Sequence, residues 1–419
     1  MKGFDFKKII LRSAALILAA VIILCACACD GGGKGPAKPT DVPQPTEPTE
    51  APATEEPTPD INSFDYTEKT IDADTLFDFC KTQGRTVKTL YTAKKSIGER
   101  MAIPLDYTAA SIEFRAYCEG TVTASVFARS TQIGGSKLYV SVYCDGVLLG
   151  EHRADRVVKT AKDVDVVLGE NLERGLHTFL IERQTEAERG TIYINSITLK
   201  GELTARPADS KYFIEVIGDS ITTGYGNLWP DNADGEKSAN VAGNEYVDGT
   251  KSYAVLAAKA VGADYSIVAQ QGIGIVIGWQ PHIMLDTYTE TCYQCDRHEA
   301  WTFPRKADVV VINLGTNDIH FCNSGACKIS KLEKGVRDFL KLVREKNPDA
   351  KILWAYGMMD TSFFPYIEAA VEEFGGAEKG FYTLKLSPNG AGGNGHPNLK
   401  AHEDNAVTLA NKLRELLGI

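Results

Sequence analysis

Residues 212–222 read Tyr-Phe-Ile-Glu-Val-Ile-Gly-Asp-Ser-Ile-Thr, an apolar run that ends in Gly218-Asp219-Ser220. The run predicts a buried strand, and the residues after it predict a tight turn into a helix. Ser220 would then lie at a helix N-terminus, where backbone N–H groups are unpaired and the local field favours negative charge. A serine in that position can attack a carbonyl carbon, and the resulting oxyanion can be held there. Gly-Asp-Ser alone is weak evidence, because most serines are only solvated polar groups.

Two further segments strengthen this interpretation. Gly315-Thr316-Asn317-Asp318 follows a second apolar strand, and Gly395-His396-Pro397-Asn398 lies near the C-terminus. From Tyr212 onward, strand-like runs alternate with amphipathic segments, which predicts a parallel sheet with helices on both faces and chemistry at the carboxyl ends of the strands. The expected strands are 213–217, 266–268, 308–313, 352–356 and 381–386, and the expected helices are 252–261, 329–345, 364–373 and 399–417.

The preceding region, residues 61–205, has a different pattern. Apolar residues alternate with polar ones in short runs, and turn residues such as Asp145-Gly146 separate the runs. Seven or more candidate strands predict an antiparallel β-sandwich, of jelly-roll type. They include the runs 112–118, 122–128, 138–144, 147–149, 164–168, 177–181 and 191–199. This region shows no nucleophile, metal cluster or Gly-rich phosphate loop in its sequence. We therefore expect two folded domains, a sandwich over 61–205 and an α/β domain of three α/β/α layers over 206–419.

The N-terminus predicts export. Four cations precede an apolar run over 14–24 that is short for a membrane span, which is typical of a signal peptide. The sequence Leu24-Cys25-Ala26-Cys27 resembles a bacterial lipobox, so we expect a lipoprotein signal over 1–29 with Cys27 as the lipidated residue. Cys29 is an alternative site, and a plain signal peptide or an uncleaved anchor is an alternative for the whole segment.

Residues 30–60 predict an extended tether. They hold eight of the 17 prolines of the chain, among Thr and Glu and without apolar periodicity. Anchor and tether together predict an extracellular protein held at the cell surface, with the membrane as a partner through the lipid. The formal net charge of −10 argues against nucleic acid as a partner.

Four blocks in order resemble the SGNH (GDSL) hydrolase superfamily over roughly residues 210–419. They are Gly218-Asp219-Ser220, Gln271-Gly272, Gly315-Thr316-Asn317-Asp318 and His396. Within that superfamily, a sandwich ahead of Ile217–Gly226, followed by 250–254, 310–318 and Gly357-Met358-Met359, resembles carbohydrate esterase family 2. That resemblance implies a two-domain acetyl esterase acting on plant-wall polysaccharide, with acetylated polysaccharide or oligosaccharide as its partner.

The resemblance also implies roles for single residues. Ser220 would be the nucleophile and His396 the general base and acid. The oxyanion would be held by the N–H groups of Ser220 and Gly272 and by the Asn317 amide. Asp219 and Asp318 are interpreted as local scaffolding. Neither a cofactor nor a metal is expected.

One position departs from the superfamily pattern. Members usually carry Asp three residues before the histidine, and here that position is Gly393. Either a backbone carbonyl orients His396, giving a Ser-His dyad, or an acid arrives from elsewhere. We favour the dyad, and Asp360 is the substitute acid that we name.

Cysteines and tryptophans near the motifs leave alternatives open. For Cys292/Cys295 and Cys322/Cys327 we expect disulfides first, free thiols second and a structural metal third. Cys80, Cys118 and Cys144 resemble small buried hydrophobes. The tryptophans either stack on sugars or belong to the core; they are Trp229, Trp279 and Trp301.

The sequence therefore predicts a surface-anchored carbohydrate O-acetyl esterase. An esterase for another bacterial glycan is one alternative, and a glycan-binding surface protein without turnover is another. The presence of Ser220, Asn317 and His396 argues against the second, because a degenerate site usually loses one such residue.

Overall fold

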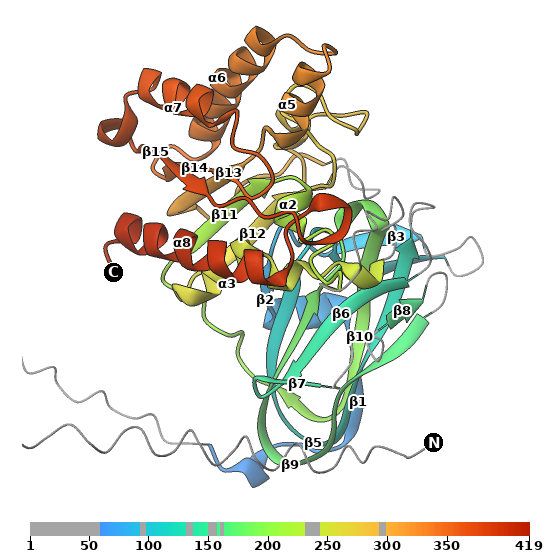
Figure 1. The fold of residues 1–419 in the computed structure, drawn as a ribbon. Coiled ribbons are helices and arrows are strands. Elements are labelled where there is room, and N and C mark those ends of the chain that lie inside the picture. Colours follow the sequence, from blue (N-terminus) through green and yellow to red (C-terminus); the bar gives the residue numbers. More distant parts are fainter. Residues whose placement is uncertain are drawn as a thin grey trace, which may run out of the picture. The chain divides into compact units, whose positions relative to one another are not determined.

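The computed structural model describes residues 59–92, 98–130, 137–149, 157–159, 163–230, 244–292 and 299–419. The predicted lipoprotein signal with Cys27 lies outside these residues, as does the predicted tether up to residue 58. Within the described residues, no helix has the length and apolar character needed to cross a membrane. These residues form two sheets, one antiparallel and one parallel (Figure 1).

The N-terminal sheet is antiparallel and has ten strands, in the main order β3-β4-β10-β5-β9-β6-β7, with β1 on β10, β2 on β5 and β8 on β6. The strands enclose one apolar core, to which the short helix α1 (Ala73–Phe79) adds Leu76. This confirms the predicted antiparallel domain. The strands are β1 (Glu68–Asp72), β2 (Lys81–Gln83), β3 (Thr89–Thr92), β4 (Glu99–Leu105), β5 (Ser111–Ser130), β6 (Lys137–Cys144), β7 (Val147–Leu148), β8 (Val157–Lys159), β9 (Asp163–Arg183) and β10 (Gly190–Leu203).

Two long strands correct the expected division of this sheet. The runs around 112–118 and 122–128 are a single strand, β5, and the runs 164–168 and 177–181 are both parts of β9. The register between β5 and β9 shifts around Gly120, whose φ is +76°. A glycine with positive φ and a shifted register bend a strand without ending it. Figure 1 shows both strands curving along the length of the domain.

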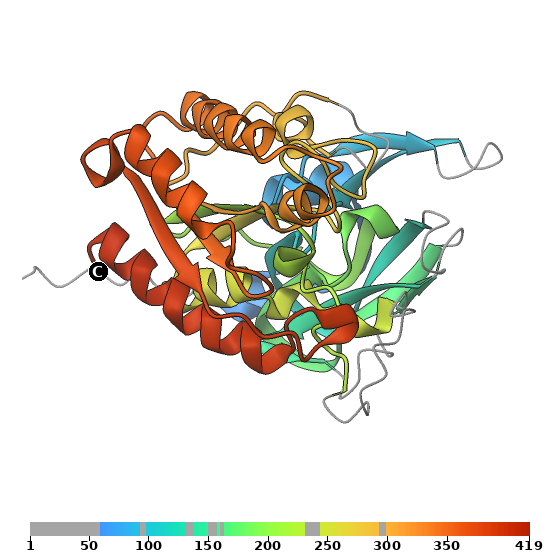
Figure 2. The same ribbon diagram turned by 45° about the horizontal axis from the view of Figure 1, so that its top comes forward.

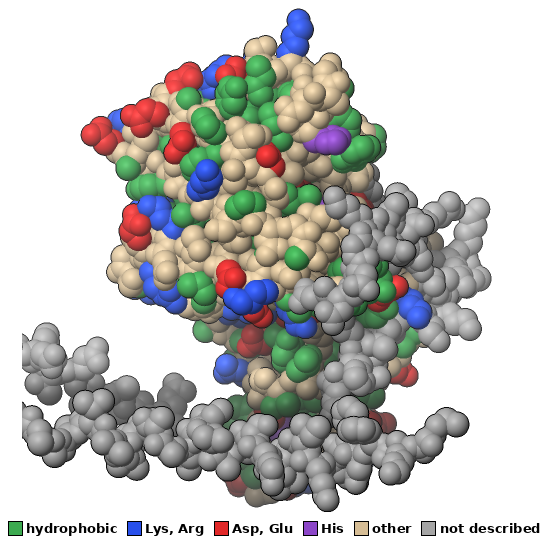
Figure 3. Space-filling view, viewed as in Figure 1, with side chains coloured by type: hydrophobic (Ala, Val, Ile, Leu, Met, Phe, Trp, Pro, Cys, Tyr) green, Lys and Arg blue, Asp and Glu red, His purple; other side chains and the backbone are tan. Residues whose placement is uncertain are grey.

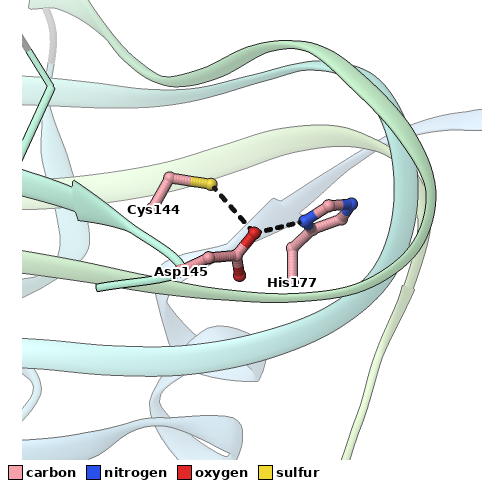
Figure 4. Close-up of side chains that lie close together, drawn as sticks. All are labelled: Cys144, Asp145 and His177. Atoms are coloured by element: carbon pink, nitrogen blue, oxygen red, sulfur yellow. Dashed lines mark hydrogen bonds and ion pairs between the residues drawn. The ribbon is translucent and has the colours of Figure 1, made fainter. Parts of the chain in front are cut away.

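The predicted Asp145-Gly146 turn joins β6 to β7. The Asp145 side chain forms hydrogen bonds with the neighbouring strand β9 (Figure 4). Asp145 Oδ2 lies 2.7 Å from Nδ1 of His177 on β9 and 3.9 Å from Sγ of Cys144. Asp145 Oδ1 accepts a hydrogen bond from the Thr178 N–H at 2.8 Å, and His177 Nε2 donates to the Glu173 carbonyl. The structure thus brings together three side chains of types that bind metals, in a region where the sequence predicted no metal cluster. Asp145 is hydrogen-bonded to both of the other side chains.

The C-terminal sheet is parallel and confirms the predicted α/β class. Its order is β12-β11-β13-β14-β15. Each predicted strand is present within two residues of its expected ends. The strands are β11 (Phe213–Gly218), β12 (Asp264–Ala269), β13 (Val309–Asn313), β14 (Lys351–Gly357) and β15 (Phe381–Leu386). The helices are α2 (Ser220–Thr223), α3 (Tyr253–Ala260), α4 (Met284–Thr287), α5 (Thr316–Asn323), α6 (Ile329–Lys346), α7 (Phe364–Glu373) and α8 (Leu399–Leu417).

Helices cover both faces of this sheet (Figures 1 and 2). On β13, Val310 and Ile312 pack into a core with α6 and α7, whereas Val309 and Val311 pack into a second core with α3 and α8. Alternate residues of a strand point to opposite faces, so a strand covered on both sides is apolar throughout. The result is the expected three-layer α/β/α arrangement.

The sandwich contacts the parallel sheet through buried polar groups. Arg85, between β2 and β3, is 2 % exposed and donates to Glu215 Oε1 on β11 at 3.0 Å and to the Glu290 carbonyl at 2.6 Å. Figure 3 shows one face of the molecular surface. Among the side chains coloured there, acidic and basic groups are interspersed, without a large patch of either sign on that face.

The cysteines divide into bonded and free. Cys292 is disulfide-bonded, and its predicted partner Cys295 lies outside the described residues. Cys322 and Cys327 are free thiols, which corrects the disulfide expected between them. Cys322 lies on α5 and Cys327 beyond its end, where the two side chains share a hydrogen bond instead of a covalent bond. The other described free cysteines are buried, as expected, and are Cys80, Cys118 and Cys144.

Candidate active site

Ser220 is the first residue of α2 and follows β11 after a single residue. That residue, Asp219, caps the helix, because its Oδ1 accepts from the Ile221 N–H at 3.0 Å. The turn is tight: a Cβ added to Gly218 would lie 2.0 Å from Oγ1 of Thr222. The strand, the glycine and the cap together place the Ser220 hydroxyl at a helix N-terminus, where the sequence predicted it.

His396 lies next to Ser220 in space, although the two residues are far apart in the sequence. Its Nε2 lies 2.8 Å from Ser220 Oγ, within hydrogen-bond distance. His396 follows a short turn over Gly393–Gly395 and precedes α8. Burial lowers the pKa of His396 to about 4, so the ring is neutral and able to accept a proton at ordinary pH.

Among the described residues, no carboxylate contacts the His396 ring. The backbone of Asn394 and Gly393 interacts with the ring and raises its pKa, which partly offsets the effect of burial. Nδ1 is buried, and no side chain among the described residues forms a hydrogen bond with it. Asp360 accepts from the Ser362 N–H and hydroxyl instead, at 3.0 and 2.6 Å. Asp360 therefore does not supply the missing acid. The ring packs edge-on against Tyr225, with centroids 4.7 Å apart.

The loop after β12 holds the second block, with Gly272 at φ +73°. Asn317, on the first turn of α5, donates from Nδ2 to the Ile273 carbonyl at 2.8 Å, so its amide lies against this loop. The neighbouring Asp318 accepts from three backbone N–H groups of the same loop, at 2.8, 2.8 and 3.1 Å. We refer to residues 270–278, which contain the predicted oxyanion donor Gly272, as the oxyanion loop. The structure thus brings Gly272 and Asn317 together, and Asp318 is scaffolding.

Burial also affects the two carboxyl groups behind the site. The pKa of Asp219 is raised to about 7, mainly by burial and further by the nearby Asp318. The pKa of Asp318 is raised by burial, against which its three backbone N–H donors act. Both carboxyl groups are bound to backbone N–H groups, so neither is free to serve as a base.

Of the three tryptophans near the motifs, Trp279 lies next to the oxyanion loop. Its backbone N–H donates to the Gly272 carbonyl at 2.8 Å. The residue is 67 % exposed, and its ring packs against Phe321. Trp301 lies over Arg85 instead, and Trp229 packs on Tyr246. An exposed indole beside the site is suited to stacking on a sugar ring.

Three side chains near the site were not predicted from motifs. Tyr225 lies in the Gly-Tyr-Gly after the nucleophile, and Gln271 was named only for its place before Gly272. Arg189 comes from the sandwich and donates to Gln271 Oε1 at 3.0 Å. The glycine-flanked tyrosine is the sequence signal that could have indicated Tyr225, whereas Arg189 lies in no motif.

Comparison with known proteins agrees with this geometry. The model of the GDSL-like Lipase/Acylhydrolase family matches residues 216–416. Cellulase/esterase CelE of Acetivibrio thermocellus is 30% identical over 275 residues, which is 62% of this chain and 32% of the relative. An acetylxylan esterase / glucomannan deacetylase of Cellvibrio japonicus is 30% identical over 179 residues, 41% of this chain and 47% of the relative. This chain therefore spans about a third to a half of these curated relatives.

Solved structures resemble the chain over both domains. A family two carbohydrate esterase from Clostridium thermocellum, in complex with cellohexaose, has a TM-score of 0.66 and 25% identity, and covers 81% of this chain and 99% of its own. The acetyl xylan esterase Est2A of Butyrivibrio proteoclasticus has a TM-score of 0.70 and 20% identity, and covers 84% and 99%. Residues 216–416 of this chain therefore match the GDSL-like Lipase/Acylhydrolase family, and the two domains together have the fold of family 2 carbohydrate esterases.

Proposed function

We propose that this chain is a carbohydrate O-acetyl esterase that removes acetyl groups from plant-wall polysaccharide of xylan or mannan type. The observation that carries the proposal is the 2.8 Å contact between Ser220 Oγ and His396 Nε2 beside the oxyanion loop. The names of the curated relatives, acetylxylan esterase and glucomannan deacetylase, support the substrate class. The exposed Trp279 at the loop supplies a surface for a sugar ring.

The reaction follows from the positions of these groups. Ser220 Oγ attacks the acetyl carbonyl carbon while His396 Nε2 takes the hydroxyl proton. The oxyanion is held by the N–H groups of Ser220 and Gly272 and by the Asn317 amide. The bond to the sugar oxygen then breaks, and His396 returns its proton to that oxygen. Water repeats the sequence on the acetyl-Ser220 ester and releases acetate.

Acetate release from acetylated xylan and acetylated glucomannan tests the proposal. Ser220→Ala and His396→Ala should reduce release to background, and Asn317→Ala should lower kcat by about 10²–10³ through the loss of one oxyanion donor. Ser63→Ala, a serine far along the chain in an exposed turn, is the control and should retain wild-type activity. A wild type that releases acetate from neither polymer nor from 4-nitrophenyl acetate would contradict esterase activity.

The same assay separates the alternatives. Release from acetylated peptidoglycan but not from xylan or glucomannan would assign another glycan as the substrate. Binding of the polymers without release would assign a glycan-binding protein.

We further propose that the chain is anchored outside the cell through lipid on Cys27. The charged and apolar residues before the lipobox, and the Pro-rich residues after it, support this proposal. Metabolic labelling with a fatty-acid analogue should mark the wild type and the Cys29→Ser control but not Cys27→Ser. The reverse pattern would move the lipid to Cys29, and no labelling of the wild type would contradict an anchor.

A further inference from the structure

A buried segment of the sandwich contacts two of the segments that form the candidate active site. Residues 184–189, between β9 and β10, form what we call the sandwich segment. Its Glu186 accepts from the Thr223 hydroxyl on the nucleophile helix α2 at 3.0 Å. Its Glu188 accepts from Gln280 at 2.9 Å, and Gln280 also donates to the Gln271 carbonyl at 2.8 Å. The segment therefore contacts both α2 and the oxyanion loop.

Arg189 of this segment fixes the orientation of Gln271. The guanidinium is 3 % exposed and donates to Gln271 Oε1 at 3.0 Å. Because a guanidinium has only donors, the amide oxygen must face it, and the amide NH₂ is left to point away. The Gln271 side chain forms its other hydrogen bond with the hydroxyl of Tyr225.

Tyr225 carries the chain of contacts to the histidine. Its hydroxyl also accepts from Asn394 Nδ2 at 3.0 Å, and Asn394 belongs to the turn before His396. The Tyr225 ring is 4 % exposed and packs at 65° against the imidazole, with centroids 4.7 Å apart. A ring fixed at its hydroxyl by two amides is a rigid wall for the imidazole.

The charges around Arg189 allow it to remain buried. Glu186 and Glu188 each approach the guanidinium to 3.6 Å. Burial raises the pKa of both Glu186 and Glu188, and the positive Arg189 acts against that rise in each. The two carboxyl groups beside the guanidinium offset the cost of burying its charge.

We propose that Arg189, Gln271 and Tyr225 are positioning residues that hold His396 in place of the carboxylate missing at Gly393. The sandwich is then part of the catalytic apparatus, since the chain of contacts begins on it. This inference rests on the esterase function proposed above. It assigns to Arg189 no contact with the substrate.

Gln271→Leu and Tyr225→Phe test the inference without removing a charge. Each should lower kcat for acetate release by about 10- to 100-fold, because small displacements of a catalytic group cost that much, while KM stays near the wild-type value. The double variant should lose little more than the worse single variant, because both changes interrupt one chain of contacts. Lys259→Met is the control. It removes the 2.9 Å ion pair to Glu182 between the same two domains, and Lys259 takes no part in the series of contacts that leads to His396.

An NMR titration of the His396 imidazole supplies a readout that does not depend on turnover. Its midpoint should lie near the pKa of about 4 in the wild type and in Lys259→Met, and should rise toward 6.5 in Gln271→Leu and Tyr225→Phe as the ring gains water. Folded variants with wild-type kcat and a wild-type midpoint would overturn the inference. A wild type without esterase activity would refute the proposed function, and the midpoints would still decide whether these residues hold the ring.

Discussion

In the proposed mechanism, His396 acts as a base in unusual surroundings. A catalytic histidine is normally oriented by a hydrogen bond at the nitrogen that does not touch the nucleophile. Here no side chain among the described residues binds Nδ1, and the imidazole lies beside the backbone of Asn394 and Gly393 and packs against Tyr225. The lowered pKa keeps the ring neutral over a wider range of pH, although a base of low pKa is also a weaker proton acceptor.

The pH dependence of activity should reflect this burial. The neutral imidazole is the active form, and it is lost as the pH falls through the pKa of the folded protein. With that pKa at about 4, the acid limb of kcat/KM should have its midpoint near pH 4 and not near the usual 6.5. Initial rates on a soluble acetyl ester between pH 3 and 8 measure it.

Asp219→Asn is the control for that assignment. Burial raises the pKa of Asp219 to about 7, so its carboxyl group also titrates within the range measured. The variant keeps an acceptor for the Ile221 N–H, and the limb near pH 4 should remain. An acid limb near 6.5 in the wild type would contradict the effect of burial on His396, and loss of the limb in Asp219→Asn would reassign it to the carboxyl group.

Among the elements, α5 and the oxyanion loop act as one unit. Asp318 on α5 accepts hydrogen bonds from three backbone N–H groups of the loop, and it directly follows Asn317 in the sequence. Asp318→Asn replaces one acceptor oxygen by a donor and should lower kcat by about 10- to 100-fold, because Gly272 and Asn317 lose their spacing. It should also lower the free energy of unfolding by about 1–3 kcal/mol. Acetate release and urea denaturation measure the two effects.

Asp308→Asn provides the matched control. Asp308 lies just before β13, and its Oδ2 accepts from the Phe213 N–H at 2.8 Å, at the end of the sheet opposite the site. The control should lose stability and keep its kcat. Equal loss of kcat in both variants would show that the effect of Asp318 is general destabilisation.

The elements also show what the sequence could predict. Strands buried on both faces and helices with an apolar face have strong periodic signals, so β11 and α6 were predicted within a residue or two. The four-residue α2 is too short for such a signal, and α5 buries only one apolar side chain, Ile319, although the motifs marked where both helices begin. The alternation of apolar residues is interrupted at Gly120, so the single strand β5 was predicted as two runs.

The molecule as a whole explains which part of the site the sequence missed. The predicted site residues all follow a strand of the parallel sheet or precede one of its covering helices, so the sequence predicted that they come together. They are Ser220, Gly272, Asn317 and His396. Arg189 enters from the other domain through a contact with a residue 82 positions away. A buried charge pattern of this kind has no period and no motif, and only the three-dimensional arrangement of the domains indicates it.

Arg85 tests whether the two domains are stable only together. It is buried against Glu215 of β11 and lies over the rings of Tyr288 and Phe303. Arg85→Met leaves Glu215 buried without its ion-pair partner and should lower the free energy of unfolding by about 3–5 kcal/mol. Adding Glu215→Gln should recover part of that loss, because the uncompensated charge is removed.

Urea denaturation followed by tryptophan fluorescence and by circular dichroism decides the question. Both signals should give one coincident transition in the wild type and in both variants, since the buried pair couples the domains. A loss below about 1 kcal/mol in Arg85→Met would place this pair with ordinary surface ion pairs. Two separate transitions in the wild type would show that the domains unfold independently, and the sandwich would then not be a fixed support for the catalytic segments.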